Sequence, residues 1–271
     1  MTTAWPALPA ESFDALALQQ LLTTRVFGRT LEVFTSTTST NDVLKTLAQQ
    51  GAPEGTVVLA EHQTQGRGRY GRTFASPAGV GLYLSILLRP RIETARLPQL
   101  TFMTAVATAD ALVAHSALPV RLKWPNDVEI AGKKVAGILS EVVLNPPAPP
   151  AVILGIGINV NTTLAHLPPA LHQHVTSLAL EADHAWPRGP LMAALLSHCE
   201  HWHHLWQQGE YATILQTWLR YSAIIGRQVA FPHEPQTDPA LVVGLDHDGA
   251  LLVQQATGAL RRVVAGEVAF V

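Results

Sequence analysis

A short stretch of glycines and arginines, residues 62–85, holds the residue types that could bind a negatively charged group. It reads HQTQGRGRYGRTFASPAGVGLYLS, and Arg67, Arg69 and Arg72 alternate with glycines in it. Apolar, strand-like segments flank the stretch, so its backbone amides and guanidinium groups are expected to converge on one side of a loop. Because arginine grips a phosphate or carboxylate with two parallel hydrogen bonds, the pattern favours an anion-binding loop over a merely solvated one.

The glycines of this loop also match a dinucleotide-binding pattern, but the surrounding sequence argues against that chemistry. Gly66, Gly68 and Gly71 satisfy G-x-G-x-x-G, which needs a helix directly afterwards to hold a pyrophosphate. Here a proline and further glycines follow and lead into a strand. A P-loop fails too, because the Gly132–Lys133 pair is followed by lysine instead of serine or threonine, and the kinase signatures do not occur.

Polar residues also stand out at two other points of the chain. On sequence alone, Ser39, Thr40 and Asn41 are candidates to cap the helix that follows them. Lys123 begins the segment KWPND at the exit of a strand. It could form a surface pair with Asp127, worth about 0–1 kcal/mol.

The overall composition describes an ordered globular protein. The 271 residues are 48% hydrophobic and 14% charged, which allows a sizeable core. The net charge of −2 lacks the basic excess of a dedicated nucleic-acid binder, so the arginine stretch is a local feature. Cys199 is the single cysteine, which excludes an internal disulfide and fits a reducing compartment. With no signal-like or membrane-spanning pattern, we expect a soluble cytoplasmic protein.

The first half of the chain is expected to mix helices and strands. Phe13 and the leucines at 16, 18, 21 and 22 lie roughly on one side of an N-terminal helix. The second helix begins at Ser39 or Thr40 and stops at Gly51. The expected elements are helices over 11–24, 41–50 and 98–117 and strands over 30–36, 55–63 and 81–90.

The second half predicts a hairpin, a long helical region and short C-terminal strands. The hairpin turns near Ala131–Gly132, and residues 145–150 connect it to a strand over 151–160. Gly155 and Gly157 interrupt that strand, either in a packed bulge or because something approaches closely. Residues 188–225 are helical with a break near Gln208–Gly209, and strands follow from residue 226. The fold class is therefore α+β, a mixed β-sheet flanked by helices with a small C-terminal β domain.

Four motifs in order make the chain resemble the biotin protein ligases. They are STN (39–41), AEHQTQGRGRYGR (60–72), KWPNDVEIAGKKVAGIL (123–139) and GIGINVN (155–161). No single motif would suffice, but their order and spacing are specific, and the resemblance covers roughly residues 30–271. It implies a biotin/lipoate-ligase-like catalytic domain at 1–225 and a small C-terminal β-barrel domain at 226–271. The type that it resembles is the monofunctional one, which lacks an N-terminal DNA-binding domain.

The resemblance implies a two-step reaction that uses ATP, biotin and Mg²⁺. The biotin carboxylate attacks the α-phosphate of ATP, giving biotinyl-5′-adenylate and pyrophosphate. The lysine ε-amine of an apo biotin carboxyl carrier protein, an acetyl-CoA carboxylase subunit, then attacks the acyl carbon. Both steps crowd anions together and expose a mixed anhydride, so they need cations and exclusion of water.

The resemblance also implies which residues bind biotin. The biotin ring is assigned to Ser39, Thr40, Asn41 and Gln63. The biotinyl carboxylate and the α-phosphate are assigned to the loop around them and to one lysine: Arg67, Gly68, Arg69 and Lys134. The catalytic set implied in this way is Arg67, Arg69, Lys123 and Lys134.

A second implied set binds the nucleotide. Its members are Arg69, Arg72, Phe74, Lys123, Trp124, Asn126 and Asn159. Phe74 stands where family members often carry tryptophan, so the adenine is expected to meet a smaller ring. Asn126 and Asp127 are assigned to positioning phosphate or Mg²⁺, with Asp127 a candidate contact and no firm metal ligand.

The neighbouring lysines at 133 and 134 are separated by strand geometry. Successive side chains of a strand point to opposite faces, so only one of the two can face a pocket. The motif match selects Lys134 and leaves Lys133 to solvent.

The histidine-rich stretch HCEHWHH (198–204) is interpreted as a polar helix face. It lacks the His-Glu-x-x-His spacing of a zinc helix, and Trp202 and Trp206 mark a buried stripe on the same helix.

Two other functions remain to be weighed. A lipoate or octanoate ligase of the same fold is the alternative enzyme, although the Gly-Arg loop and KWPND favour biotin. A biotin-responsive repressor would need a winged helix-turn-helix, and only one helix is expected before residue 31. We therefore expect no specific DNA binding and no membrane association, with the chain acting as a monomer or a homodimer.

Overall fold

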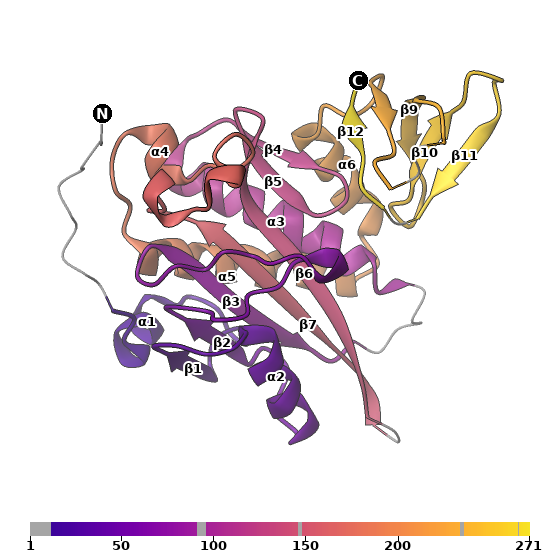
Figure 1. Cartoon of the computed structure of the whole chain (residues 1–271). Coiled ribbons are helices and arrows are strands. Elements are labelled where there is room, and N and C mark those ends of the chain that lie inside the picture. The colour runs from indigo at the N-terminus through magenta and orange to yellow at the C-terminus, as the bar shows by residue number, and fades with distance from the viewer. Residues whose placement is uncertain (1–11, 91–95, 146–147, 234–235, 265) are drawn as a thin grey trace.

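The main body of the molecule is a seven-stranded mixed sheet (Figure 1). This computed structural model describes residues 12–90, 96–145, 148–233, 236–264 and 266–271. The strand order is β1–β2–β3–β7–β6–β5–β4; β1 runs parallel to β2, and the other neighbours are antiparallel. The strands are β1 (Leu31–Phe34), β2 (Val57–Ala60), β3 (Gly81–Leu88), β4 (Val120–Lys123), β5 (Asp127–Ile130), β6 (Lys133–Asn145) and β7 (Ala148–Asn159).

Helices cover both faces of this sheet. They are α1 (Ala15–Leu21), α2 (Thr40–Gln49), α3 (Gln99–Ser116), α4 (Leu178–Ala182), α5 (Arg188–Gln207) and α6 (Tyr211–Tyr221). Side chains alternate between faces along each strand, so Leu84 of β3 packs in the cluster with α3 and α5, while Leu87 packs with α2. The two apolar clusters therefore hold the helices on opposite faces.

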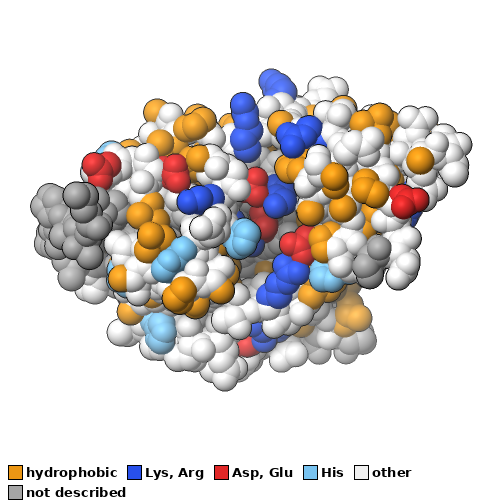
Figure 2. All heavy atoms as spheres, turned by 45° about the horizontal axis from the view of Figure 1, so that its top comes forward, with side chains coloured by type: hydrophobic (Ala, Val, Ile, Leu, Met, Phe, Trp, Pro, Cys, Tyr) orange, Lys and Arg blue, Asp and Glu red, His pale blue; other side chains and the backbone are white. Residues whose placement is uncertain are grey.

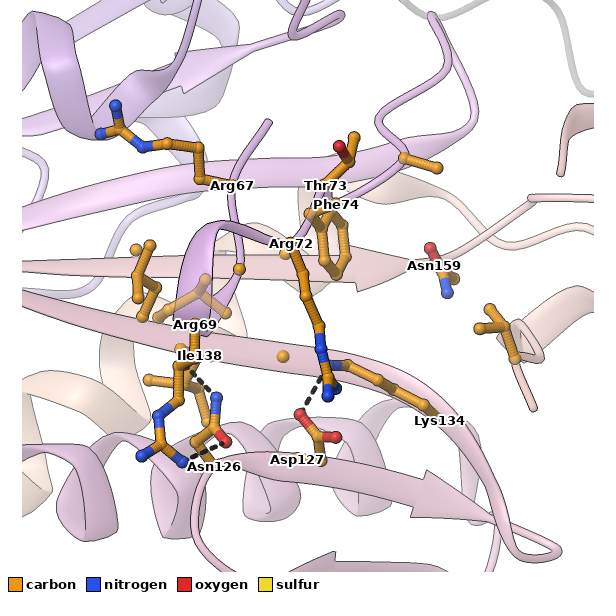
Figure 3. A pocket seen from close by; sticks show the side chains of 18 of the residues that line it. Arg67, Arg69, Arg72, Thr73, Phe74, Asn126, Asp127, Lys134, Ile138 and Asn159 are labelled. Carbon is orange, nitrogen blue, oxygen red and sulfur yellow. Dashed lines mark hydrogen bonds and ion pairs between the residues drawn. The ribbon is translucent and has the colours of Figure 1, made fainter. Parts of the chain in front are cut away.

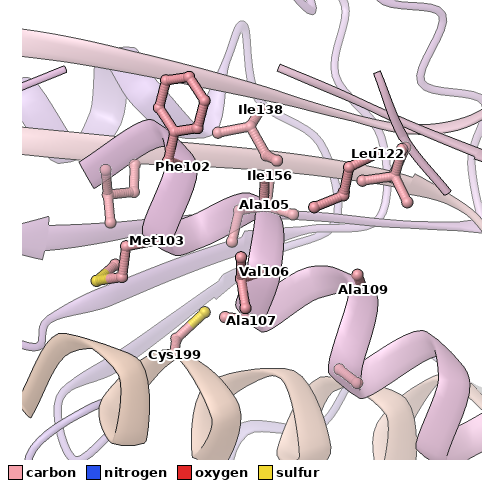
Figure 4. Packing of buried hydrophobic residues seen from close by; sticks show 14 of the residues in the cluster. Phe102, Met103, Ala105, Val106, Ala107, Ala109, Leu122, Ile138, Ile156 and Cys199 are labelled. Carbon is pink, nitrogen blue, oxygen red and sulfur yellow. The ribbon is translucent and has the colours of Figure 1, made fainter. Parts of the chain in front are cut away.

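The larger cluster centres on α3, which is buried on nearly every side. Its small residue Ala107 lies toward Cys199 of α5, and the two helices are in extensive contact (Figure 4). Cys199 of α5 is fully buried in this contact, and burial raises the pKa of its thiol to about 12. A helix that is apolar all round shows no single hydrophobic stripe in its sequence.

A second, five-stranded antiparallel sheet forms the C-terminal part. Its order is β11–β10–β9–β8–β12, and the strands are β8 (Gln228–Ala230), β9 (Ala240–Leu245), β10 (Leu251–Gln254), β11 (Leu260–Val263) and β12 (Ala269–Phe270). Val229, Val242 and Leu251 belong to the same apolar cluster as α3. The predicted fold class is confirmed. Within the described ranges, no helix has the length and apolarity needed to span a membrane.

The expected turns and helix ends are confirmed where positive φ angles were needed. Ala131 and Gly132 form the β5–β6 turn with φ of 51° and 76°, and Gly209 separates α5 from α6 with φ of 87°. Gly51 follows the C-cap of α2 with φ of 90°. Residues 146–147 of the predicted strand connection lie outside the described residues, but β6 and β7 pair up to Asn145 and Ala148.

The N-terminal prediction is wrong in part. Its first residue lies outside the described range, and α1 is shorter than the predicted helix. Leu18 and Leu22 are buried, whereas Leu16 is 72% exposed, because a helix of seven residues buries only a narrow stripe.

The polar-face interpretation of residues 198–204 is also wrong in part. His203 is buried, with its ring stacked on Trp206 at 5.8 Å between centroids and tilted against Phe27. Burial lowers the pKa of His203, so its imidazole favours the neutral form that packs as an aromatic ring. Across the described chain, no group of three metal-ligating side chains comes together, here or elsewhere.

Candidate functional site

A cavity of about 510 Å³ opens where the main sheet, the 62–80 segment and the C-terminal sheet meet. We call residues 62–80 the arginine loop. Figure 2 shows basic and acidic side chains gathered around a hollow in this face. Every residue that the sequence assigned to a site lines the cavity: Ser39, Thr40, Asn41, Gln63, Arg67, Gly68, Arg69, Arg72, Phe74, Lys123, Trp124, Asn126, Asp127, Lys134 and Asn159. Their spatial convergence is thus observed, while their individual roles stay predictions.

One end of the cavity is a hydrogen-bonded network at the start of α2. Ser39 occupies the N-cap, but its side chain makes no capping hydrogen bond. Instead, the amide and the hydroxyl of Thr40 donate to Oε1 of Gln63, at 2.9 and 3.2 Å. Ser85 of β3, which the sequence did not single out, donates to Thr40 Oγ1 at 2.7 Å and is also 2.6 Å from Asn41 Oδ1. Apart from the half-buried Gln63, these groups are buried, and together they form a polar wall of mutually hydrogen-bonded side chains.

The first arginine of the loop points away from the other two. Figure 3 shows its side chain extending away from those of Arg69 and Arg72. Arg67 makes a two-pronged contact with Asp42 of α2, at 2.6 and 3.0 Å, and lies 3.4 Å from Glu141 of β6. The hydrogen bond to Asp42 raises the pKa of Arg67. All three arginines line the cavity, but the expected convergence of their guanidinium groups is wrong for Arg67, because acidic partners that are distant in sequence hold its guanidinium on α2.

Glu141 links this ion pair to the polar wall. Its Oε2 accepts from Asn41 Nδ2 at 2.6 Å, and its Oε1 pairs with Lys45 Nζ at 2.7 Å. Burial opposes ionisation, but the hydrogen bonds from Lys45 and Asn41 outweigh it and lower the pKa of Glu141. A half-buried, ionised carboxylate thus holds Asn41 and the loop together.

The other two arginines hold the loop against Gly266 and Glu267, which precede β12. Arg69 Nη1 donates to the carbonyl of Gly266 at 3.2 Å and lies 3.5 Å from Asn126 Oδ1. Arg72 makes a two-pronged ion pair with Glu267, at 2.5 and 3.1 Å. This contact raises the pKa of Arg72 and lowers that of Glu267. The C-terminal residues therefore form one wall of the site.

The strand glycines are explained by close approach of side chains. A Cβ on Gly157 would lie 2.6 Å from the Phe74 ring, and one on Gly155 would collide with Asn41. The packed-bulge alternative is not needed, because β7 pairs in unbroken register with β3 through both positions. Glycine at these sites lets Phe74 and Asn41 lie against the strand.

Two lysines line the opposite end of the cavity, each in an ion pair. Lys134 Nζ lies 2.5 Å from Asp127, and Lys123 Nζ lies 3.2 Å from Glu129. The alternative pair of Lys123 with Asp127 is wrong, although the two residues are directly opposite in the β4–β5 register. Lys134 lines the cavity and Lys133 does not, which agrees with strand alternation and with the choice that the motif match made.

Trp124 and Asn159 line the cavity but are held by the backbone of other segments. The indole N–H of Trp124 donates to the carbonyl of Gly249 in the C-terminal part, at 3.1 Å, and Asn159 Nδ2 donates to the carbonyl of Thr176, at 3.0 Å. Both side chains are buried. They are therefore rigid parts of the wall.

A segment that the sequence analysis missed completes the cavity. Leu167, Leu171 and Val175, spaced by four, line it together with His174. Two backbone hydrogen bonds hold this segment to Lys134. The N–H of Lys134 donates to the carbonyl of His174, and the N–H of Thr176 donates to the carbonyl of Lys134, both at 2.9 Å. The spacing was visible in the sequence, but its short 3₁₀ turns resemble an ordinary loop.

The fold and this site define the architecture of a biotin protein ligase. The biotin protein ligase from Aquifex aeolicus, solved in complex with biotin and ATP, superposes with a TM-score of 0.77 at 29% identity, covering 90% of this chain and 99% of that one. The model of the biotin/lipoate A/B protein ligase family matches residues 33–159, and that of the biotin protein ligase C-terminal domain matches residues 224–271.

Sequence relatives agree with this assignment. The bifunctional ligase/repressor of Bacillus subtilis is 33% identical over 91% of this chain and 76% of that protein. The biotin–[acetyl-CoA-carboxylase] ligase of Paracoccus denitrificans is 34% identical over 79% of this chain and 89% of that protein. The chain belongs to the biotin/lipoate A/B protein ligase family.

Proposed function

We propose that this protein activates biotin with ATP to biotinyl-5′-adenylate and transfers the biotinyl group to a lysine of a biotin carboxyl carrier protein. The observation that carries the proposal is the single cavity that joins the polar wall at α2 to the basic groups at β4–β6. One end offers amides and hydroxyls to a ureido ring. The other offers ammonium and guanidinium groups to a carboxylate and phosphates.

The geometry suggests how these residues act. The wall of Thr40, Asn41 and Gln63 orients the biotin ring, so its carboxylate extends toward Arg69 and Lys134. Lys134 then exchanges Asp127 for the substrate anions and stabilises the charge that develops as the carboxylate attacks the α-phosphate. The same cations hold the adenylate until the lysine amine attacks the acyl carbon, releasing AMP.

Mg²⁺ fits this site in one respect. Magnesium is usually held by one or two carboxylates together with substrate phosphates. Asp127 is the carboxylate in the cavity that is freed when Lys134 turns to substrate. When bound there with ATP, the ion would neutralise phosphate charge.

We place the division between the catalytic and C-terminal domains at residues 225/226, and we infer a cytoplasmic location and a monomer or homodimer. The strands from β8 onward form a sheet of their own, which supports this boundary. The contacts of Arg69 and Arg72 with Gly266 and Glu267 suggest that both domains are needed for activation.

The polar wall favours biotin over lipoate or octanoate. An acyl chain or dithiolane offers no amide to Thr40, Asn41 and Gln63, so buried polar groups would face hydrocarbon. Pyrophosphate release should therefore require biotin. Release with lipoate or octanoate but not with biotin would contradict the proposal.

Transfer is tested on an apo carrier domain with labelled biotin. Label should appear on one lysine only when ATP is present. A carrier whose acceptor lysine is replaced by arginine is the matched control.

A further inference from the structure

A buried ion pair lies at the base of the arginine loop. Glu61 directly follows β2, Arg188 begins α5, and Arg188 Nη1 lies 2.6 Å from Glu61 Oε2. Arg188 Nη2 donates to the other carboxylate oxygen at 3.2 Å, so the contact is two-pronged. The two side chains are 3% and 9% exposed, and neither lines the cavity.

Arg188 joins the two ends of the loop. Besides Glu61 at the start, its Nη1 donates to the carbonyl of Gly81, where β3 begins, at 3.1 Å. The planar guanidinium fork can hold a carboxylate and a carbonyl at once, whereas a lysine ammonium lacks this fixed geometry. A loop fixed at both ends loses less conformational freedom when it closes on a ligand.

Tyr83 extends this anchoring to the cavity. It is fully buried in β3, and its hydroxyl donates to the carbonyl of Pro77 in the loop at 3.0 Å. Its ring meets Phe74 edge-on with centroids 6.3 Å apart, and Phe74 lines the cavity. Gly81 lies so close to the Tyr83 ring that a Cβ would collide with it. A shift of Gly81 would therefore move Tyr83 and Phe74 with it.

Phe13 shields the pair from water. Its ring lies 4.1 Å from Arg188 Cζ, and its N–H donates to Glu61 Oε1 at 2.6 Å. Such an enclosed pair contributes little net stability compared with apolar side chains of similar size. The directed contacts of Arg188 with both ends of the loop point instead to a role in positioning the loop.

We propose that Arg188 is a positioning residue of the ligase reaction, which acts through Glu61 and Gly81 to set where the loop holds Arg69 and Phe74 around the acyl-adenylate. This inference rests on the proposed biotin activation. Without the anchor, the loop opens more often and the adenylate escapes before a carrier lysine can attack.

The experiment measures dissociation of labelled biotinyl-adenylate from the full-length protein. The wild type must first form the adenylate from biotin and ATP; if it forms none, the proposed function is wrong, and this inference falls with it. Given that result, Arg188→Lys and the double variant Glu61→Met/Arg188→Met should each release the adenylate about tenfold faster, with a raised KM for ATP. Dissociation within twofold of wild type in either variant would overturn the positioning role while leaving the proposed function intact.

A control on the same helix separates positioning from stability. Glu200 of α5 accepts the backbone N–H groups of Arg25, Val26 and Phe27 and contributes no cavity lining. Glu200→Ala should lower the Tm and leave adenylate dissociation unchanged. The double Met variant should recover Tm relative to Arg188→Lys, because apolar packing replaces the ion pair. Fast dissociation in a variant with recovered Tm supports the role; wild-type dissociation there overturns it.

Discussion

For the two adjacent lysines at 133 and 134, the direction of the side chain is expected to decide the effect of a substitution on the reaction rate. Lys134 lines the cavity beside Asp127, and Lys133 does not line it. Loss of a cation at the reacting phosphate typically costs about 3 kcal/mol, roughly a hundredfold in rate. We therefore expect Lys134→Gln to cut pyrophosphate release about a hundredfold and Lys133→Gln to stay within a few-fold, since surface changes cost about 0.5 kcal/mol or less. Equal effects in folded proteins, or the reverse ranking, would refute the assignment.

Gly157 allows a second prediction at the residue scale. A Cβ there would lie 2.6 Å from the Phe74 ring. Overpacking of this kind typically costs about 1–3 kcal/mol of stability, and it would also displace the Phe74 ring. Gly157→Ala should therefore lower the Tm and raise the KM for ATP several-fold. Adding Phe74→Ala removes the clash and should restore the Tm. An unchanged Tm and KM in Gly157→Ala would show that the ring moves freely.

These residues differ in how far sequence could predict them. Glycines in a strand are a local signal, so Gly157 could be located in advance. Strand alternation showed only that one of Lys133 and Lys134 faces a pocket, and the motif match selected Lys134. The direction of Arg67 could not, because it depends on Asp42 and Glu141, which only the tertiary fold brings beside it. Ser85 was missed for the same reason: a serine in an apolar strand is informative only once its buried partners are known.

At the scale of elements, the arginine loop is a connector held at three places. Arg67 fastens it to α2, Arg72 to the C-terminal sheet, and Arg188 to α5. Sequence predicted the strands on either side of the loop but not these partners, since ion pairs between distant elements leave no periodic pattern. The conformation of the loop therefore depends on tertiary contacts more than on its local sequence.

The contact between Arg72 and Glu267 predicts a pH dependence. Its hydrogen bond lowers the pKa of Glu267 below the ordinary value of 4.5. A carboxylate with a lowered folded pKa adds stability above its unfolded pKa and loses it as the pH falls through the folded pKa. The free energy of unfolding of wild type should exceed that of Glu267→Gln by up to about 1 kcal/mol at pH 7, because both groups are partly exposed. The difference should vanish in strong acid.

Arg72→Gln is the matched partner for this measurement. A double-mutant cycle should show that the two changes are not additive at pH 7 and become additive in acid. Additivity at both pH values would mean that the contact contributes nothing in solution.

At the scale of the whole molecule, both sheets share one apolar cluster, so we expect a single unfolding transition. Cys199 is a built-in reporter, since it is fully buried between α3 and α5 and its thiol has a pKa of about 12. A thiol reagent at pH 8 should leave the native protein unmodified. In denaturant, labelling should follow the change in tryptophan fluorescence. Labelling while fluorescence stays native would reveal local opening of α5.

The fit between Gly249 and the main body limits how such proteins can be recombined. Gly249 has φ of 88°, accepts the indole N–H of Trp124 and lies so close to Phe102 that a Cβ would lie 2.5 Å from its ring. A C-terminal module grafted from a relative would have to present glycine, in this left-handed conformation, at this one turn. Chimeras could therefore be sorted before synthesis by a single position. Those with a side chain there would place the new module away from Trp124 and leave the cavity without the wall formed by Gly266 and Glu267.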